Sequence, residues 1–194
     1  MRKALLILGL VISYIVNAQD LKKEEEKSSL GIKGGYNLAS VRNADGYETS
    51  QRQGFSLGVY GESYFTNFLS IQPELIYSQQ GYAVEGSSYK LTQKINYINF
   101  PLMFKLYPSK IFYAEVGPQI GYAISHKEKT ETFILENTRE FEPKSFDWGL
   151  NLGTGFKSES GLVLGARYHH GLGKIYDETN YYNKVIQLFL GFEF

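Results

Sequence analysis

Three histidines are the side chains best suited to acid–base or nucleophilic chemistry in this chain of 194 residues, which contains no cysteine. A Ser-His-acid arrangement needs a histidine beside a serine and a carboxylate that orients the ring. Ser125 and His126 are neighbours in a polar segment, whereas His169 and His170 are consecutive in an alternating segment and therefore point to opposite faces. No nucleophile, base and orienting group can be read together. The sequence therefore predicts no catalytic residue, no cofactor and no metal site.

A larger set of charged residues recurs at alternate positions of apolar segments, on one face only. Buried charges are tolerated when they are paired and hydrogen-bonded, so we expect these acids and bases to form a structural network inside a narrow barrel. A narrow ion path is the alternative function for the same residues. The set is Lys33, Glu62, Glu74, Lys105, Glu115, Asp147, Arg167 and Glu193.

Eight alternating segments would position these charges. The last, Val185–Phe194, has large apolar residues at every second position, as a strand with one apolar face does. Proline in a paired strand is confined to edges and bulges, so Pro73 is interpreted as a local defect in a continuing strand. The other strands are expected at Leu30–Ser40, Gly54–Phe65 and Ile95–Tyr107, and from Leu69, Phe112, Phe146 and Leu162 onward.

The connections alternate between long loops and short turns. The long loops are predicted at Arg42–Gln53, Gln79–Gln93, Ser125–Lys144 and Gly173–Asn183, and the short turns at Thr66–Asn67, Pro108–Lys110 and Ser158–Gly161. An even strand number with alternating connections is typical of outer-membrane barrels. We therefore predict an all-β fold, an eight-stranded antiparallel up-and-down transmembrane β-barrel, with both termini in the periplasm and the long loops outside the cell.

The first residues resemble a targeting segment. Arg2-Lys3 precedes an apolar run, Ala4–Val16, and Val16-Asn17-Ala18 fits a signal-peptidase site. An N-terminal membrane anchor is the alternative, but the run is short for a span. The expected organisation is a signal peptide at 1–18, a charged periplasmic leader at 19–29 and the barrel domain at 30–194.

Charge decides which face of the barrel is outside. The face opposite the charged set has no Lys, Arg, Asp or Glu in the strand centres, which suits lipid, where a central charge costs about 2–4 kcal/mol. A soluble lipocalin-like barrel that binds an apolar ligand would turn this face inward. The membrane barrel is favoured because an aromatic girdle is also expected near the short turns. Its members are Tyr64, Phe65, Phe68, Tyr107, Phe156 and Phe194.

Three motifs, in the expected order, carry a family resemblance. Ile71–Gly81, Ile98–Lys105 and Gly117–Tyr122 resemble consecutive strands of the PorT-like outer-membrane β-barrel proteins of Bacteroidetes, and Leu30–Ala39 fits their first strand. The resemblance implies an eight-stranded outer-membrane barrel in a Gram-negative cell. It also implies a link to protein secretion for the founding member of the family, and no catalytic residues.

The loops are the remaining candidates for function. Tyr176, Tyr181 and Tyr182 are expected to form a contact surface, since tyrosine is favoured in binding patches; a merely solvated loop is the alternative. The 20 basic and 20 acidic residues balance, which gives no support for nucleic-acid binding. We expect a non-enzymatic, monomeric barrel in outer-membrane lipid. It would have a structural or interaction role at the cell surface, as an accessory to secretion or surface assembly. A protein partner would bind the extracellular loops. A lipid-modifying enzyme is the remaining alternative.

Overall fold

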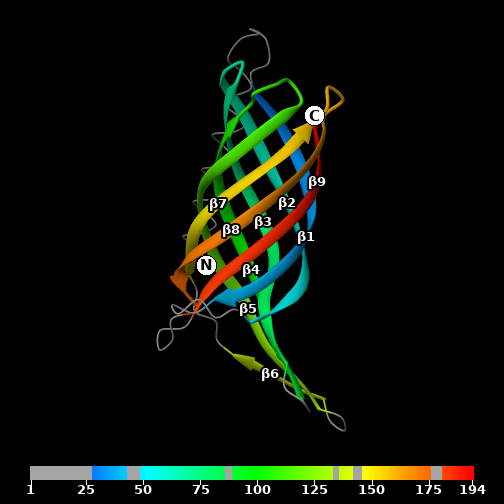
Figure 1. The fold of residues 1–194 in the computed structure, drawn as a ribbon, viewed down its shortest axis with the longest axis vertical. Coiled ribbons are helices and arrows are strands. Elements are labelled where there is room, and N and C mark those ends of the chain that lie inside the picture. Colours follow the sequence, from blue (N-terminus) through cyan, green and yellow to red (C-terminus); the bar gives the residue numbers. More distant parts are fainter. Residues whose placement is uncertain (1–27, 43–48, 86–88, 133–135, 142–145, 176–180) are drawn as a thin grey trace, which may run out of the picture.

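The computed structural model describes residues 28–42, 49–85, 89–132, 136–141, 146–175 and 181–194 (Figure 1). The predicted signal peptide and most of the predicted leader lie outside these residues. Within them the chain forms nine strands. They are β1 (Ser28–Arg42), β2 (Ser50–Thr66), β3 (Leu69–Glu85), β4 (Tyr89–Leu106), β5 (Phe112–Thr132), β6 (Glu136–Phe141), β7 (Phe146–Lys157), β8 (Leu162–Lys174) and β9 (Tyr182–Glu193).

Eight of these strands close into a ring, which confirms the predicted antiparallel barrel. Each pairs with its neighbours in chain order, and β1 pairs with β9 to complete the circle. The strands run obliquely to the long axis (Figure 1). β6 lies outside the ring, where it pairs only with the far end of β5. A closed ring has no exposed sheet edge, as lipid requires.

The prolines of the first two matched motifs, Pro73 and Pro101, lie inside strands. β3 continues on both sides of Pro73, which pairs with Leu102 of β4, and the pairing with β2 skips the position that Pro73 would occupy. Pro101 lies likewise within β4, opposite Gln119. Proline cannot donate to a ladder, so a skipped pair is the expected local defect. The prediction that Pro73 does not end its strand is confirmed.

Strands are longer and loops shorter than predicted at one end of the barrel. The loop expected at Gln79–Gln93 is wrong, because β3 extends to Glu85 and β4 begins at Tyr89. The loop expected at Ser125–Lys144 is wrong as well: β5 extends to Thr132, and β6 follows. These two hairpins project beyond the ring at what we call the long-loop end (Figure 1). The opposite end, where β2–β3, β4–β5 and β7–β8 connect, is the short-turn end.

The apolar face is outside and the charged face is inside. Leu188 and Val116 are 54% and 52% exposed, whereas Lys33 and Arg167 are each 4% exposed. A lipocalin-like barrel has the opposite arrangement, so that alternative is wrong for this chain. Two expected girdle residues are also corrected, because Tyr107 is buried in the barrel and Tyr64 packs against it. Phe65, Phe68, Phe156 and Phe194 are exposed as expected.

Candidate functional site: the lumen and the long-loop end

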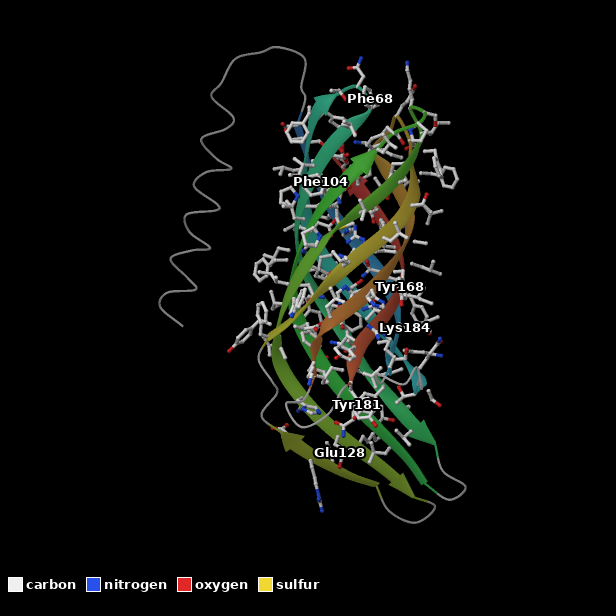
Figure 2. The ribbon with its side chains drawn as sticks, turned by 60° about the vertical axis from the view of Figure 1, so that its left-hand side comes forward. Phe68, Phe104, Glu128, Tyr168, Tyr181 and Lys184 are labelled. Atoms are coloured by element: carbon white, nitrogen blue, oxygen red, sulfur yellow. The ribbon has the colours of Figure 1, made fainter. Side chains whose placement is uncertain are left out.

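Polar atoms gather inside the ring while the outside carries mainly carbon (Figure 2). At the centre, Arg167 of β8 holds Glu74 of β3 through Nη1 and Nη2, at 2.7 and 2.9 Å, and donates from Nε to Glu115 of β5 at 2.7 Å. Lys33 of β1 donates to the same Glu74 at 2.7 Å. Gln72 Nε2 adds a hydrogen bond to Glu74 Oε1 at 2.5 Å. This central group carries two positive and two negative charges, so it is neutral.

A second group lies nearer the short-turn end. Glu62 of β2 accepts hydrogen bonds from Ser70 Oγ at 2.5 Å and from the Tyr107 hydroxyl at 2.6 Å. Lys105 Nζ is 3.3 Å from Glu62 Oε2, and Lys157 Nζ is 3.4 Å from the same oxygen. Lys157 also pairs with Glu193. We call the four ionised side chains Glu62, Lys105, Lys157 and Glu193 the inner group, and it is again neutral.

Lys157 is the functional residue that sequence reasoning missed. It lies at the last position of β7, and its side chain reaches Tyr64 at 2.9 Å as well as the two carboxylates. Its sequence neighbours, Ser158 to Gly161, are turn residues, so the alternation that marks an inward side chain ends there. An unequal charge count was the available signal, because the predicted network held five acids against three bases.

The third polar group lies beyond the central one, toward the long-loop end. Asp147 of β7 accepts a hydrogen bond from Asn183 Nδ2 at 2.9 Å and lies 3.7 Å from His169 Nε2. His169 Nδ1 is 2.8 Å from Asn151 Oδ1. Asn183 also donates to the Tyr97 hydroxyl at 3.2 Å. Asp147 is therefore apart from the predicted bases, and its partners are amides and a histidine.

Apolar and aromatic clusters fill the lumen around and beyond these groups. Toward the long-loop end the cluster is Val41, Ile95, Tyr97, Ala123 and Ile175, with Tyr82 and Tyr181 against it. Toward the short-turn end it is Tyr107, Tyr113, Val163 and Phe189, with Tyr64 against it. Between them lies a cavity of about 20 Å³ beside Arg167 and His169. That volume holds about one water molecule. An open recess of about 470 Å³ lies at the short-turn end, beside Lys110 and Lys157.

The three histidines do not converge. His126 Nε2 is 2.6 Å from Gln93 Oε1 on the projecting part of β4 and β5. His169 faces the lumen, and His170 lies on the outward side, 2.8 Å from Arg42 Nη2. No three potential metal-ligating side chains gather within the part of the chain that the structure describes. Within the same part, no helix has the length and apolarity to cross a membrane.

The predicted tyrosine surface is only partly described. Tyr181 is half-buried and packs against the apolar cluster at the long-loop end. Tyr182 stacks with Arg42, whose Cζ is 4.9 Å from the ring centroid. Tyr176 lies outside the described residues. The two described tyrosines each have a partner within the chain.

The comparisons with known proteins agree with this geometry. The family model described as outer membrane protein beta-barrel domain matches residues 17–177. The fold is similar to Ail, the attachment invasion locus protein of Yersinia pestis, with a TM-score of 0.50 and 18% identity over 87% of this chain and 99% of that one. It is also similar to Neisserial surface protein A, with a TM-score of 0.55 and 14% identity over 87% and 100%. No curated protein sequence matches. At these identities the likeness to solved structures shows the fold alone.

Proposed function

Because the chain belongs to the outer membrane protein beta-barrel domain family, we propose that it is a sealed, non-enzymatic outer-membrane barrel that holds a protein-contact surface at the long-loop end. The observation that carries the proposal is a filled lumen beneath a sheet that continues beyond the ring. Ion-pair groups and two apolar clusters occupy the interior of the part that the structure describes, which supports a sealed barrel. The projecting β3–β4 and β5–β6 hairpins then remain as the part able to meet a partner.

The absence of an enzyme function is part of the proposal. His169 and His170 find amide, arginine and tyrosine partners among the described residues, and none of these is a nucleophile activated by a base. Within the described lumen the carboxylates are committed to cations or amides. The lipid-modifying alternative therefore has no supporting geometry in the described residues.

The orientation and processing follow the sequence. Residues 1–18 would be removed as a signal peptide, and residues 19–29 would lead from the periplasm into β1, which begins at Ser28 rather than at Leu30. Both termini would then lie in the periplasm, and the projecting hairpins would lie outside the cell. The resemblance of Ile71–Gly81 and Ile98–Lys105 to PorT-like barrels of Bacteroidetes favours an accessory role in protein secretion or surface assembly, by a monomeric barrel.

The lumen charges serve structure in this proposal. The eight predicted residues, with Lys157 added, tie together strands that are far apart in the chain and hold the barrel shut. Arg167 alone links β8 to β3 and β5. The contact surface would include the loop of Tyr176, Tyr181 and Tyr182 beside the hairpins, and its partner would be a protein.

A chain without cysteine allows a direct test of orientation and contact. Thr138→Cys places one thiol on exposed β6, and Ser160→Cys places one in the exposed turn at the other end. A membrane-impermeant maleimide should label the first variant in intact cells and the second only after permeabilisation. A photoactivatable maleimide at position 138 should then give a discrete protein adduct that is absent at Leu188→Cys in the lipid belt.

Two results would contradict the proposal. Labelling of the Ser160→Cys variant in intact cells would reverse the orientation. An adduct pattern at position 138 identical to that in the lipid belt would show that the projecting hairpins meet no protein partner.

A further inference from the structure

Arg42 is an outward-facing cation at the point where the apolar wall ends. It is the last residue of β1, and its Nη2 spans β9 to reach His170 Nε2 at 2.8 Å and the Gly171 carbonyl at 3.2 Å on β8. The Tyr182 ring stacks on the guanidinium at 4.9 Å. The hydrogen bonds described for Arg42 both use Nη2, and Nε is buried without a partner among the described residues. A guanidinium has five N–H donors, and the two on Nη1 take part in none of the hydrogen bonds described for Arg42, so they are the donors offered to a ligand.

The described partners of Arg42, which are His170, Gly171 and Tyr182, carry no negative charge, so they fix its position rather than neutralise it. The arginine donates to His170 Nε2, so that nitrogen accepts and Nδ1 carries the proton, which points to the Tyr168 hydroxyl at 3.3 Å. Lys184 lies opposite His170 across β8 and β9. Its positive charge disfavours protonation of the His170 ring. An arginine, a lysine, a histidine and two tyrosines thus form one outward patch, which we call the Arg42 patch: Arg42, Tyr168, His170, Tyr182 and Lys184.

The patch lies at the boundary between the lipid-facing wall and the projecting hairpins. Toward the short-turn end, the next outward side chains on β9 are Ile186 and Leu188, 38% and 54% exposed. Figure 2 shows Tyr168 and Lys184 on the wall, below Phe68 and Phe104 and above Tyr181. Tyrosine rings and basic residues at this height are typical of the layer in which lipid headgroups lie.

We propose that the Arg42 patch binds the phosphate of an anionic lipid in the leaflet at the long-loop end. A guanidinium held flat against an aromatic ring offers paired N–H donors that match phosphate oxygens. The acyl chains of the same lipid would lie on Ile186 and Leu188, so charge and apolar area are contiguous.

Trp148 allows the test without added labels. It is the one tryptophan of the chain, it is 48% exposed on β7, and its indole lies against Gly173 of β8. The barrel is reconstituted in vesicles of dibrominated phosphatidylcholine, which quench Trp148, and the quenching is relieved by adding dioleoyl phosphatidic acid. The recovery of Trp148 fluorescence measures how strongly phosphatidic acid associates with the barrel relative to phosphatidylcholine. Arg42→Gln is compared with Lys110→Gln, which removes the same charge at the short-turn end.

The expected result is a preference for phosphatidic acid that falls about five-fold in Arg42→Gln and is unchanged in Lys110→Gln. Such a factor corresponds to about 1 kcal/mol, the usual contribution of one basic residue near an anionic lipid surface. Inorganic phosphate added to the vesicles should not displace the lipid. An equal preference for phosphatidic acid over phosphatidylcholine in Arg42→Gln and Lys110→Gln would overturn the proposal. Displacement of phosphatidic acid by inorganic phosphate would identify a site for free phosphate instead.

Discussion

Replacing Glu74 with glutamine should destabilise the barrel more than any single loss on its surface. The Glu74 side chain is fully buried and accepts from Lys33, from both Nη atoms of Arg167 and from Gln72. Glu74→Gln leaves two cations facing Glu115 alone, so a neutral group gains one uncompensated positive charge. Breaking a buried pair in this way costs about 3–5 kcal/mol in the free energy of unfolding.

The double variant Lys33→Met/Glu74→Gln tests the reason for that loss. It removes one charge of each sign and leaves Arg167 paired with Glu115 at 2.7 Å. If the imbalance is the main cost, the double variant should lose less stability than the two single variants added together, by about 2–3 kcal/mol, as residues of one network do. Additive losses would refute the reasoning, because they would mean that each side chain contributes only its own contacts.

Unfolding can be followed by urea titration of barrels refolded in lipid vesicles. Trp148 faces lipid in the folded barrel, so its emission shifts when unfolding exposes it to water, and a cold detergent gel gives the folded fraction independently. Glu140→Gln is the matched control, since its partner Lys127 lies 2.5 Å away on the projecting sheet and its side chain is 72% exposed. Exposed ion pairs contribute little, so the control should leave the urea midpoint unchanged.

Three further predictions concern the wall and the lumen. Leu188→Arg puts a charge in the lipid belt and should lower the unfolding free energy by about 2–4 kcal/mol in a urea titration, whereas unchanged stability would contradict a lipid-facing position. Gly165→Ala should lower the urea midpoint, because a Cβ there would lie 2.4 Å from the Phe189 ring in a filled lumen. The purified barrel should show no discrete current steps in a planar bilayer, since the apolar cluster around Val41 and Ile95 closes the long-loop end; regular steps would show an open path.

The lipid-facing part of the fold was predictable because a single rule, apolar side chains outward and polar side chains inward, holds along its strands. Lipid demands an apolar side chain at each outward position. Phe104 and Leu106 in β4 meet that demand, as do Leu188 and Leu190 in β9. Alternation therefore separates inside from outside with no knowledge of partners. The sequence could place the inward charges on a common face for the same reason, although it could not say which pairs they form.

The projecting hairpins were missed because that rule stops at the edge of the membrane. Beyond it the outward side chains meet water, so polar residues stand on both faces, as Gln79 and Gln80 do in β3 and Thr92 and Gln93 in β4, and the sequence looks like a loop. A bulge between Asn96 and Tyr97 in the β4–β5 register shifts the alternation further. His126 therefore lies buried within β5, where the sequence indicated a loop. Two-sided polar strands carry little local signal, and only pairing with their neighbours defines them.

Two of the charged groups in the lumen, the central and the inner group, are each neutral, and this division has a measurable consequence. The Tyr60 ring lies between the central and inner groups, with Lys33 Nζ at 5.8 Å and Lys105 Nζ at 5.9 Å from its centroid. Glu62→Gln leaves the inner group with one excess positive charge. Adding Lys105→Met restores neutrality in that group, whereas adding Lys33→Met leaves it charged and unbalances the central group as well.

The first double variant should therefore raise the urea midpoint of Glu62→Gln and the second should lower it further, although both have the same total charge. Charges in a low-dielectric interior interact most strongly at short range, which is why the location of the compensating change matters. Equal midpoints for the two double variants would show that the lumen responds only to its total charge. The neutrality of each separate group would then make no contribution of its own to the stability of the barrel.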